Sequence, residues 1–474
     1  MGVANLQSGA QLKRTLGLKD LVAYGMAYIA PMAPLTTFGF VWDASGGLIA
    51  LAYLLGAICM YFTAQSYATL SGEVQSAGSV YGFARHCLGE LPGFVAGWLI
   101  LLDYLLIPAL VFLIMSVGLQ ILIPGLDRAP CLVLLVAVSL GINWFGVAVT
   151  TRVSMVSVVL QFTAMFGLLG LALFALSQGK GAGTLTAAPF FDAGAFDVAK
   201  VFTATSICVL SFLGFDAIST LAEEVKDNDR RLVGRAILTV LFICAALFVV
   251  TTWVLGNLMP GVTIKDASAA IYELTSTQIG PWLALVLAWV IAVMVGLTNA
   301  LPMQVGVSRV LFAMSRDRQL PSLFARLHRR HGTPHVALVL STLLSLGIAL
   351  VMREKIDTLA SFVNFGALTA FVLLHLSVLI KLGIKRRSRR WFAHWLVPIV
   401  GIAVVLTVLD GMDIHALTMG SIWLAVGVVR PCLGNPNDRT TQRYPSTSCT
   451  DSHFGAGRVR EQARSYRCAP EYFL

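Results

Sequence analysis

The segment Ser211-Phe212-Leu213-Gly214-Phe215-Asp216 places an acidic side chain at the centre of an apolar stretch that covers residues 201–224. A stretch of this length can cross a membrane as a helix. A charge at bilayer depth costs roughly 2.5–3.5 kcal/mol on insertion scales, so such a residue normally faces a partner, a cavity or a substrate path. Gly214 loosens the helix beside the charge. We therefore predict a broken membrane span in which Asp216 is functional, the alternative being a purely structural ion pair.

A second interrupted segment lies near the N-terminus and reads Ala27-Tyr28-Ile29-Ala30-Pro31-Met32-Ala33-Pro34. Each of the two prolines removes a backbone donor and obstructs the helix. The freed carbonyls can bind a cation, and a half-helix N-terminus can bind a carboxylate. A simple proline kink explains this segment alone equally well. Two broken spans at corresponding positions of two halves, however, point to the binding site of a transporter.

The composition is that of a polytopic helical membrane protein. Of the 474 residues, 57% are hydrophobic and 12% are charged, whereas about 25% are charged in a typical soluble domain. The net charge of +10 does not indicate a nucleic-acid partner, because Lys and Arg cluster in short loops, as they do beside membrane spans. We predict an all-α integral membrane protein with about twelve spans, at residues 21–42, 47–70, 92–123, 131–149, 153–177, 201–223, 235–259, 280–313, 335–352, 358–381, 393–410 and 412–429.

The distribution of Lys and Arg sets the expected orientation. If the N-terminus lies inside, the inside segments hold 21 of these residues and the outside segments hold six, the remaining seven lying in the C-terminal tail. Short loops that carry an excess of positive charge are typically cytoplasmic. Both termini are therefore predicted to be cytoplasmic, in a multi-pass protein of the plasma membrane.

The expected domain organisation follows from these spans. The first and sixth spans are both interrupted and lie five spans apart, which suits a five-plus-five inverted repeat followed by two extra helices. The polar tail is predicted to be disordered, and a late frameshift would also produce such a tail. The predicted parts are an N-terminal segment at 1–20, a transmembrane domain at 21–429 (repeat one at 21–177, repeat two at 201–381, extra helices at 393–429) and the tail at 430–474.

The third span contains a second intramembrane acid, Asp103, followed by Tyr104 and Pro108. Asp103 either pairs with a cationic group of a substrate or locks a helix end in place. Tyr104 offers an aromatic face to an ammonium group. Two buried carboxylates, Asp103 and Asp216, therefore predict a substrate that carries at least one ammonium group.

The sequence gives no indication of an enzyme, a cofactor or a metal site. It contains no nucleophile–base pair, no phosphate-binding loop, and no Cys-x-x-Cys or Cys/His cluster. His375 stands alone in an apolar run, and we interpret it as a buried histidine whose hydrogen bonds are satisfied.

Several segments, taken together and in order, resemble the amino acid–polyamine–organocation superfamily of permeases, over residues 16–429. Within that superfamily the chain is most similar to putrescine-importer-like members, on the segments at 27–39 and 102–108. The superfamily likeness rests on Ala77-Gly78-Ser79-Val80-Tyr81, on the segment 211–216 with Glu223-Glu224, on Ser308-Arg309 through Arg316-Asp317, on Gly332-Thr333-Pro334, and on Phe362-Val363-Asn364-Phe365-Gly366-Ala367-Leu368.

The resemblance implies the ten-helix inverted-repeat core with two added helices, and a central site between the first, third, sixth and eighth spans. It also implies secondary transport, commonly coupled to protons. Phe215 would cover the site, and Asp216 would act as a gate or a cation contact. The breaks would hold backbone groups of the substrate, through Ala27, Tyr28 and Ala30 in the first span and Phe212 and Gly214 in the sixth.

This sequence departs from the pattern of the superfamily at three places. The first break lacks the glycines that many amino acid permeases have there. Gln161 stands where many members have a lysine that replaces a sodium ion, and a neutral amide cannot supply a cation or a proton. Thr36 stands where putrescine-importer-like members tend to have an acid. Protonation of Asp103 or Asp216 is therefore our preferred hypothesis for coupling, since a carboxyl group removed from water binds a proton more readily.

We predict a secondary active transporter that imports amino acids or related amines by alternating access, with protons as the coupling ion. A polyamine importer or exchanger, for putrescine above all, is the first alternative. A non-transporting nutrient sensor on the same scaffold is the second.

Overall fold

In the computed structural model the described residues are 16–433, apart from 75, 77, 145–146, 195, 227–228, 329–332 and 413, and for 147–154, 230, 294–295, 297–298 and 429–433 the backbone alone is described. The membrane part belongs to one unit, Met1–Pro431. The predicted disorder of the tail falls almost entirely on residues 434–474, which lie outside the described residues. Ala77 of the superfamily motif lies outside them as well.

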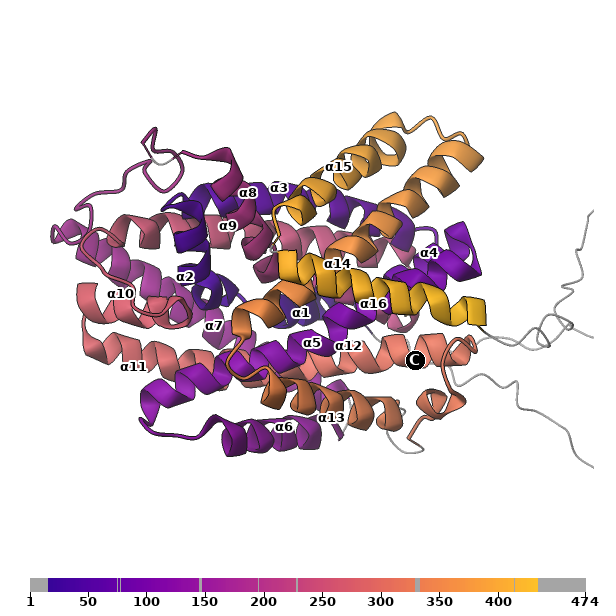
Figure 1. Cartoon of the computed structure of the whole chain (residues 1–474), viewed down its shortest axis with the longest axis horizontal. Helices are drawn as coiled ribbons and strands as arrows, with labels where there is room; N and C mark the ends of the chain where they lie inside the picture. The colour runs from indigo at the N-terminus through magenta and orange to yellow at the C-terminus, as the bar shows by residue number, and fades with distance from the viewer. Residues whose placement is uncertain are drawn as a thin grey trace, which may run out of the picture. The chain divides into compact units, whose positions relative to one another are not determined.

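The described residues form a bundle of helices (Figure 1). The elements are α1 (Leu18–Ile29), α2 (Ala33–Ser45), α3 (Ile49–Ser71), α4 (Val80–Leu88), α5 (Glu90–Leu122), α6 (Arg128–Trp144), α7 (Val147–Ser177), α8 (Val198–Cys208), η1 (Val209–Phe212), η2 (Phe215–Glu224), α9 (Arg230–Leu258), η4 (Ala267–Ala269), α10 (Ala270–Gln278), α11 (Pro281–Trp289), η5 (Val290–Gly296), α12 (Leu297–Arg316), η6 (Ser322–Ala325), α13 (His335–Val351), α14 (Ile356–Val378), η7 (Leu379–Lys385), η8 (Phe392–Leu396), α15 (Val397–Asp410) and α16 (Ile414–Leu433).

The prediction of an all-α membrane protein with about twelve spans is confirmed. Among the described residues, seven helices are long and apolar enough to cross a membrane, and the bent pair α1 and α2 makes an eighth span. Four shorter apolar helices account for the other predicted spans, at Arg128–Trp144, Pro281–Val293, His335–Val351 and Ile414–Val428. The sixth span is the composite of α8, η1 and η2, and the eighth is the composite of α11, η5 and α12.

Two short helices that the sequence pattern did not predict help to define the repeat. Helix α4 follows α3, the second span of the first half, and α10 follows α9, the second span of the second half. Each has nine residues, and in Figure 1 they lie at opposite ends of the spans. The same order of elements therefore occurs twice, with the short helix at the opposite end in the second half, as an inverted repeat requires.

The two broken spans pack against each other in antiparallel directions. Helix α1, the first half of the first span, contacts η2, the second half of the sixth span. Helix α2, the second half of the first span, contacts α8, the first half of the sixth. Helices α3 and α9, which follow the broken spans in their halves, also pack together (Figure 1). The two breaks consequently face each other in the middle of the bundle.

The last helix, α16, is held on α5 by a reciprocal pair of tryptophans. The rings of Trp98 and Trp423 stack with their centroids 4.4 Å apart. The indole nitrogen of Trp98 donates to the carbonyl of Trp423 at 2.9 Å, and that of Trp423 donates to the carbonyl of Trp98 at 3.0 Å. Stacking combined with two satisfied indole donors stabilises this contact at bilayer depth.

Candidate functional site

The break in the first span separates α1 from α2, which are bent by 41° relative to each other. Ala30 has a φ of 64° and a ψ of 121°, a conformation that residues other than glycine rarely adopt. The amide of Ala33 donates to the carbonyl of Ala30 at 3.0 Å, and that of Leu35 to Met32 at 3.0 Å, while Pro31 has no amide hydrogen. The start of α2 therefore has few amides left to donate, whereas the last carbonyls of α1 have no partner within their helix.

The break in the sixth span is formed by a glycine and closed by an acid. Gly214 has a φ of 121°, and a Cβ at this position would collide with the ring of Tyr28, so glycine is required here. The Asp216 carboxylate accepts a hydrogen bond from the Gly214 amide at 3.1 Å and another from the Tyr104 hydroxyl at 2.5 Å. Asp216 thus caps the first turn of η2 with its own carboxylate, in the position where a helix N-terminus can bind an anion.

Tyrosines extend this contact to the neighbouring helices. The Tyr104 ring lies 6.3 Å from that of Tyr28, and Tyr28 lies 6.2 Å from Tyr24. The Tyr24 hydroxyl donates to the carbonyl of Pro302 in α12 at 3.2 Å. The Tyr104 hydroxyl also lies 3.5 Å from Ser79, just before α4. The first, third, sixth and eighth spans are therefore joined by one aromatic and polar network around Asp216.

Asp103 lies beside this network but in a different state. Its side chain is buried, its Oδ1 has no hydrogen-bond partner among the described residues, and its charge repels that of Asp216. Gly366 of α14 allows a close approach here, because a Cβ on it would lie 2.9 Å from the Asp103 amide nitrogen. Asp216 is thus anchored at both oxygens, while Asp103 has one oxygen without a partner among the described residues.

A cavity of about 60 Å³ lies next to both breaks. Asn299 lines it, and the Oδ1 atom of this buried side chain has no hydrogen-bond partner among the described residues. The described residues of its lining include no charged side chain and are Ile29, Ala33, Thr36, Thr37, Ile107, Leu110, Val111, Ile114, Leu210, Ser211, Leu213, Ile291, Gly296, Asn299 and Met303. These residues come from the first, third, sixth and eighth spans, the four spans that the resemblance implies for a central site.

A second cavity, of about 100 Å³, lies next to the first. The two share Thr36, Thr37, Leu110, Ile114 and Leu210. The second cavity is also lined by η4, α10 and the first turns of α14, where Asp357 is exposed. An apolar cavity of about 150 Å³ can hold a benzene molecule, so the two together are on the scale of a small solute. We call the two cavities the chamber, and its outer part the Asp357 end.

The opposite side of the breaks is closed by ion pairs, of which one joins the two halves of the chain and the others lie within the second half. Arg309 of α12 forms an ion pair with Glu224 of η2, with the nitrogen and oxygen 2.6 Å apart and both side chains nearly buried. Arg85 of α4 pairs with Asp317, which also accepts a hydrogen bond from Tyr81 at 2.8 Å. We call this region the Asp317 end.

A neighbouring ion pair at the Asp317 end is more exposed. Arg316 bonds to Glu223 at 3.1 Å, and this hydrogen bond raises the pKa of the Arg316 guanidinium. Exposed pairs of this kind contribute little to stability, so the closure depends mainly on the buried pair of Arg309 and Glu224.

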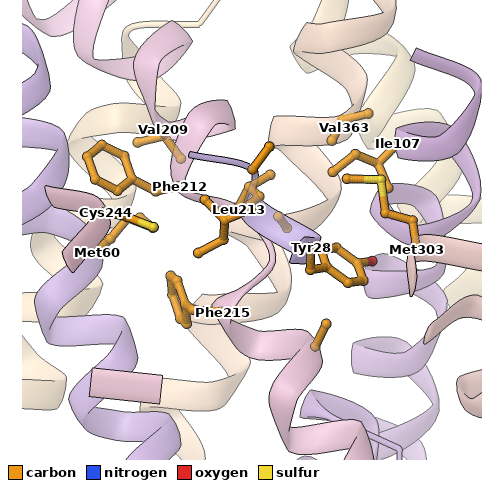
Figure 2. Packing of buried hydrophobic residues seen from close by; sticks show 14 of the residues in the cluster. Tyr28, Met60, Ile107, Val209, Phe212, Leu213, Phe215, Cys244, Met303 and Val363 are labelled. Carbon is orange, nitrogen blue, oxygen red and sulfur yellow. The ribbon is translucent and has the colours of Figure 1, made fainter. Parts of the chain in front are cut away.

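The residues that the sequence reasoning assigned to substrate binding lie around the chamber rather than on its wall, whereas Thr36, one of the departures from the expected pattern, lines both cavities. Figure 2 shows Phe212 on the side of Met60 and Cys244, and Tyr28 with Ile107 and Met303 on the other side of Leu213. Phe215 stacks on Phe371, with ring centroids 6.3 Å apart. Ala27, Tyr28, Ala30, Gly214, Tyr104 and both aspartates are buried next to the breaks, and Gln161 is buried in α7. Their roles in binding and coupling remain predictions.

The chamber wall itself was missed by the sequence reasoning. Ile29 and Ala33 flank the first break, and Ser211 and Leu213 flank the second, so each is a neighbour of a residue that was predicted. Their position next to a break was the available signal, but which side of each break faces the chamber depends on helix packing. Asn299 has no motif or charge that marks it.

Comparison with known proteins assigns the chain to a family. The family model described as amino acid permease matches residues 20–422. A low-affinity putrescine importer of Escherichia coli, PlaP, is 31% identical over 89% of this chain and 94% of its own. The branched-chain amino acid permease BcaP of Bacillus subtilis is 27% identical over 90% of this chain and 94% of its own, and the methylthioribose transporter of Bacillus subtilis is 26% identical over 88% and 92%. The chain is therefore a member of the amino acid permease family, within the amino acid–polyamine–organocation superfamily.

Proposed function

We propose that this permease is a secondary active transporter that imports amino acids or related amines across the plasma membrane by alternating access. The observation that carries the proposal is the chamber that lies between the two facing breaks and holds no charged side chain at its inner part. The last carbonyls of α1 point partial negative charge toward a solute there. Such a site favours a small solute with an ammonium group and an apolar body.

Alternating access is supported by the difference between the two ends of the path. The Asp317 end is closed by ion pairs that join α4, η2 and α12, while the chamber continues toward the Asp357 end. The excess of Lys and Arg in the loops on that side favours a cytoplasmic location for the Asp317 end and for both termini. On this assignment the structure is the state that receives solute from outside, and import requires the ion pairs at the Asp317 end to separate.

Proton coupling is the part of the proposal that depends on Asp103. This residue has an oxygen without a partner, lies beside the Tyr104–Asp216 contact, and is repelled by the Asp216 charge. A proton on Asp103 relieves that repulsion, and its loss restores it. Asp103 is therefore the group that we expect to bind and release the coupling proton, with Asp216 as its charged neighbour.

The direct test is uptake into proteoliposomes that contain the purified protein. Radiolabelled putrescine, leucine and lysine are supplied with and without an inward proton gradient. We expect at least one of them to accumulate, and the gradient to increase the accumulation severalfold. If binding occurs but no solute accumulates, the chain is a sensor rather than a transporter. Accumulation that ignores the gradient would remove the proton-coupling part alone.

A further inference from the structure

The outer part of the chamber contains a buried acceptor that the breaks do not explain. Asn364 of α14 is 3% exposed and lines the larger cavity. Its amide nitrogen donates to the carbonyl of Ser206 at 2.9 Å. A carbonyl can only accept, so this bond fixes the orientation of the amide and leaves Oδ1 as the free atom. Oδ1 has no hydrogen-bond partner among the described residues.

A buried acceptor without a partner is costly, by roughly 1–3 kcal/mol, and such an atom in a cavity is suited to a donor on a ligand. The chamber has a second atom of this kind, Oδ1 of Asn299, in its inner part. The wall that the two cavities share includes Leu110, Ile114 and Leu210. Each of the two cavities therefore has one unsatisfied acceptor, and the wall that they share combines these aliphatic side chains with the hydroxyl groups of Thr36 and Thr37.

The charges along the wall favour cations at the outer part. Asp357, Ser361 and Asn364 all line the larger cavity from α14, and their spacing of four and then three residues puts them on one face of that helix. Asp357 lies in the first turn of α14 and is exposed. In such a row, the exposed carboxylate of Asp357 attracts an ammonium group to the cavity. The buried amide oxygen of Asn364 then accepts a hydrogen bond from it.

The wall offers no comparable partner for a carboxylate. Among the residues that the structure describes, none that lines either cavity is Lys, Arg or His. At the second break the anion position is already filled by Asp216, and at the first break few amides remain free. Burial of a carboxylate without a partner is strongly unfavourable.

From this placement we propose that Asn364, with Asp357 and Ser361, forms a second ammonium subsite, and that the chamber selects linear alkane diamines over amino acids. One ammonium group lies at the end of α1 with Asn299, the methylene chain lies against the shared aliphatic wall, and the other ammonium group donates to Oδ1 of Asn364. This inference depends on the proposed transport function and specifies the class of its substrate.

The test compares two solutes that differ only in the second ammonium group. In proteoliposomes, putrescine and butylamine compete for radiolabelled putrescine uptake, with leucine as a third competitor. In the unaltered protein we expect putrescine to compete at least about tenfold better than butylamine, because a hydrogen bond to a charged group at a buried site is of that strength. Leucine should compete weakly.

The variant Asn364→Ala should lower the ratio of putrescine to butylamine affinity about tenfold, by weakening putrescine and leaving butylamine nearly unchanged. Because the ratio is measured within one preparation, partial misfolding cancels from it. Thr342→Val is the matched control, since Thr342 of α13 is also fully buried, also has a side-chain oxygen without a hydrogen-bond partner among the described residues, and lines neither cavity. Its ratio should stay at the unaltered value.

Two results would overturn the subsite. One is an equal loss of both solutes in Asn364→Ala, which means a structural role for this side chain. The other is uptake of leucine that putrescine does not inhibit, which refutes diamine selection while the transport function stands. If neither putrescine nor leucine accumulates in the unaltered protein, the transport function itself fails, and the subsite fails with it.

Discussion

The two breaks that face each other in this permease differ in the residues that form them and in the backbone groups that they leave without partners. The first break is formed by an alanine in a strained conformation and by prolines, and it exposes carbonyls. The second is formed by a glycine, and its free amide is bound by the Asp216 carboxylate of the same chain. The hydrogen-bonding group freed at the second break thus has a partner in the same chain, whereas the carbonyls freed at the first break do not have one within their helix. In the function that we propose, the first break contacts the solute, whereas the second shapes the site and holds a fixed charge.

The largest effect on stability and uptake is expected when the glycine of the second break is replaced by a residue with a side chain. Gly214→Ala puts a Cβ into the ring of Tyr28 at a φ of 121°, and strain and overpacking together should cost roughly 2–5 kcal/mol. We expect a marked fall in melting temperature and loss of uptake. Gly141→Ala in α6 is the control, because a Cβ there meets nothing within 4 Å. Equal stability of the two variants would show that the second break is not rigid.

The next effect concerns the bond between Tyr104 and Asp216. Asp216→Asn can accept from one of its two donors but turns an amide toward the other, so a loss of about 1–3 kcal/mol in stability and roughly tenfold in uptake is expected. Tyr104→Phe removes the hydroxyl donor alone. If the two groups act together, the double variant should cost less than the sum of the single ones. If the losses of thermal stability and of uptake in the two single variants add up in the double variant, the 2.5 Å contact between Tyr104 and Asp216 does not contribute a hydrogen bond.

A smaller effect on stability, but a specific one on function, is expected at Asp103. Asp103→Asn keeps the shape of the side chain and removes the carboxyl group that would bind the proton. Little stability should be lost, because Oδ1 of Asp103 has no hydrogen-bond partner among the described residues. Uptake by the unaltered protein should fall as the external pH rises from about 6 to about 8, because fewer sites are protonated. The Asp103→Asn variant should show a flat pH profile, whereas Asp216→Asn should keep the slope. Unchanged profiles in both variants would exclude these carboxylates as the coupling groups.

The smallest effect is expected at the first break. Ala30→Gly removes the strain of a positive φ and adds chain entropy to the unfolded state, so the net gain should be about 1 kcal/mol or less. Ala27→Gly, inside α1, should instead lower stability by about 0.5–1 kcal/mol. The melting temperatures of the two variants should therefore shift in opposite directions. A loss of stability in Ala30→Gly would mean that the first break is not strained.

The sequence predicted the fold well because its main signals are long. These signals are spans of about twenty apolar residues, the prolines at 31 and 34, and an acid close to Gly214. Their effect on the backbone does not depend on how the helices pack together. The nine-residue helices α4 and α10 were not predicted, since a segment of that length shows too few turns for a clear period.

The sequence reasoning named site residues beside the two breaks but not those that line the chamber. Tyr104 and Asp216 were both singled out, and the structure joins them by a hydrogen bond. Phe212, in contrast, was expected to hold the substrate, but it packs against Tyr53 and Phe248, with ring centroids 6.1 Å and 5.1 Å away. Which side of a break faces a cavity depends on how the helix is rotated against its neighbours. When a helix is apolar on all of its faces, the sequence pattern does not predict that rotation.

The most direct test of the account asks whether solute occupies the chamber at the first break. Ala33→Cys places a thiol on the chamber wall, and Phe212→Cys places one on the side of Met60 and Cys244. Each is alkylated by a small thiol reagent applied from outside, with the unaltered protein as background. We expect saturating solute to slow the alkylation of Ala33→Cys at least severalfold, whereas Phe212→Cys, at a fully buried position that lines neither cavity, should react slowly and at the same rate with and without solute. Protection of Phe212→Cys alone, with Ala33→Cys alkylated at its original rate, would contradict this account.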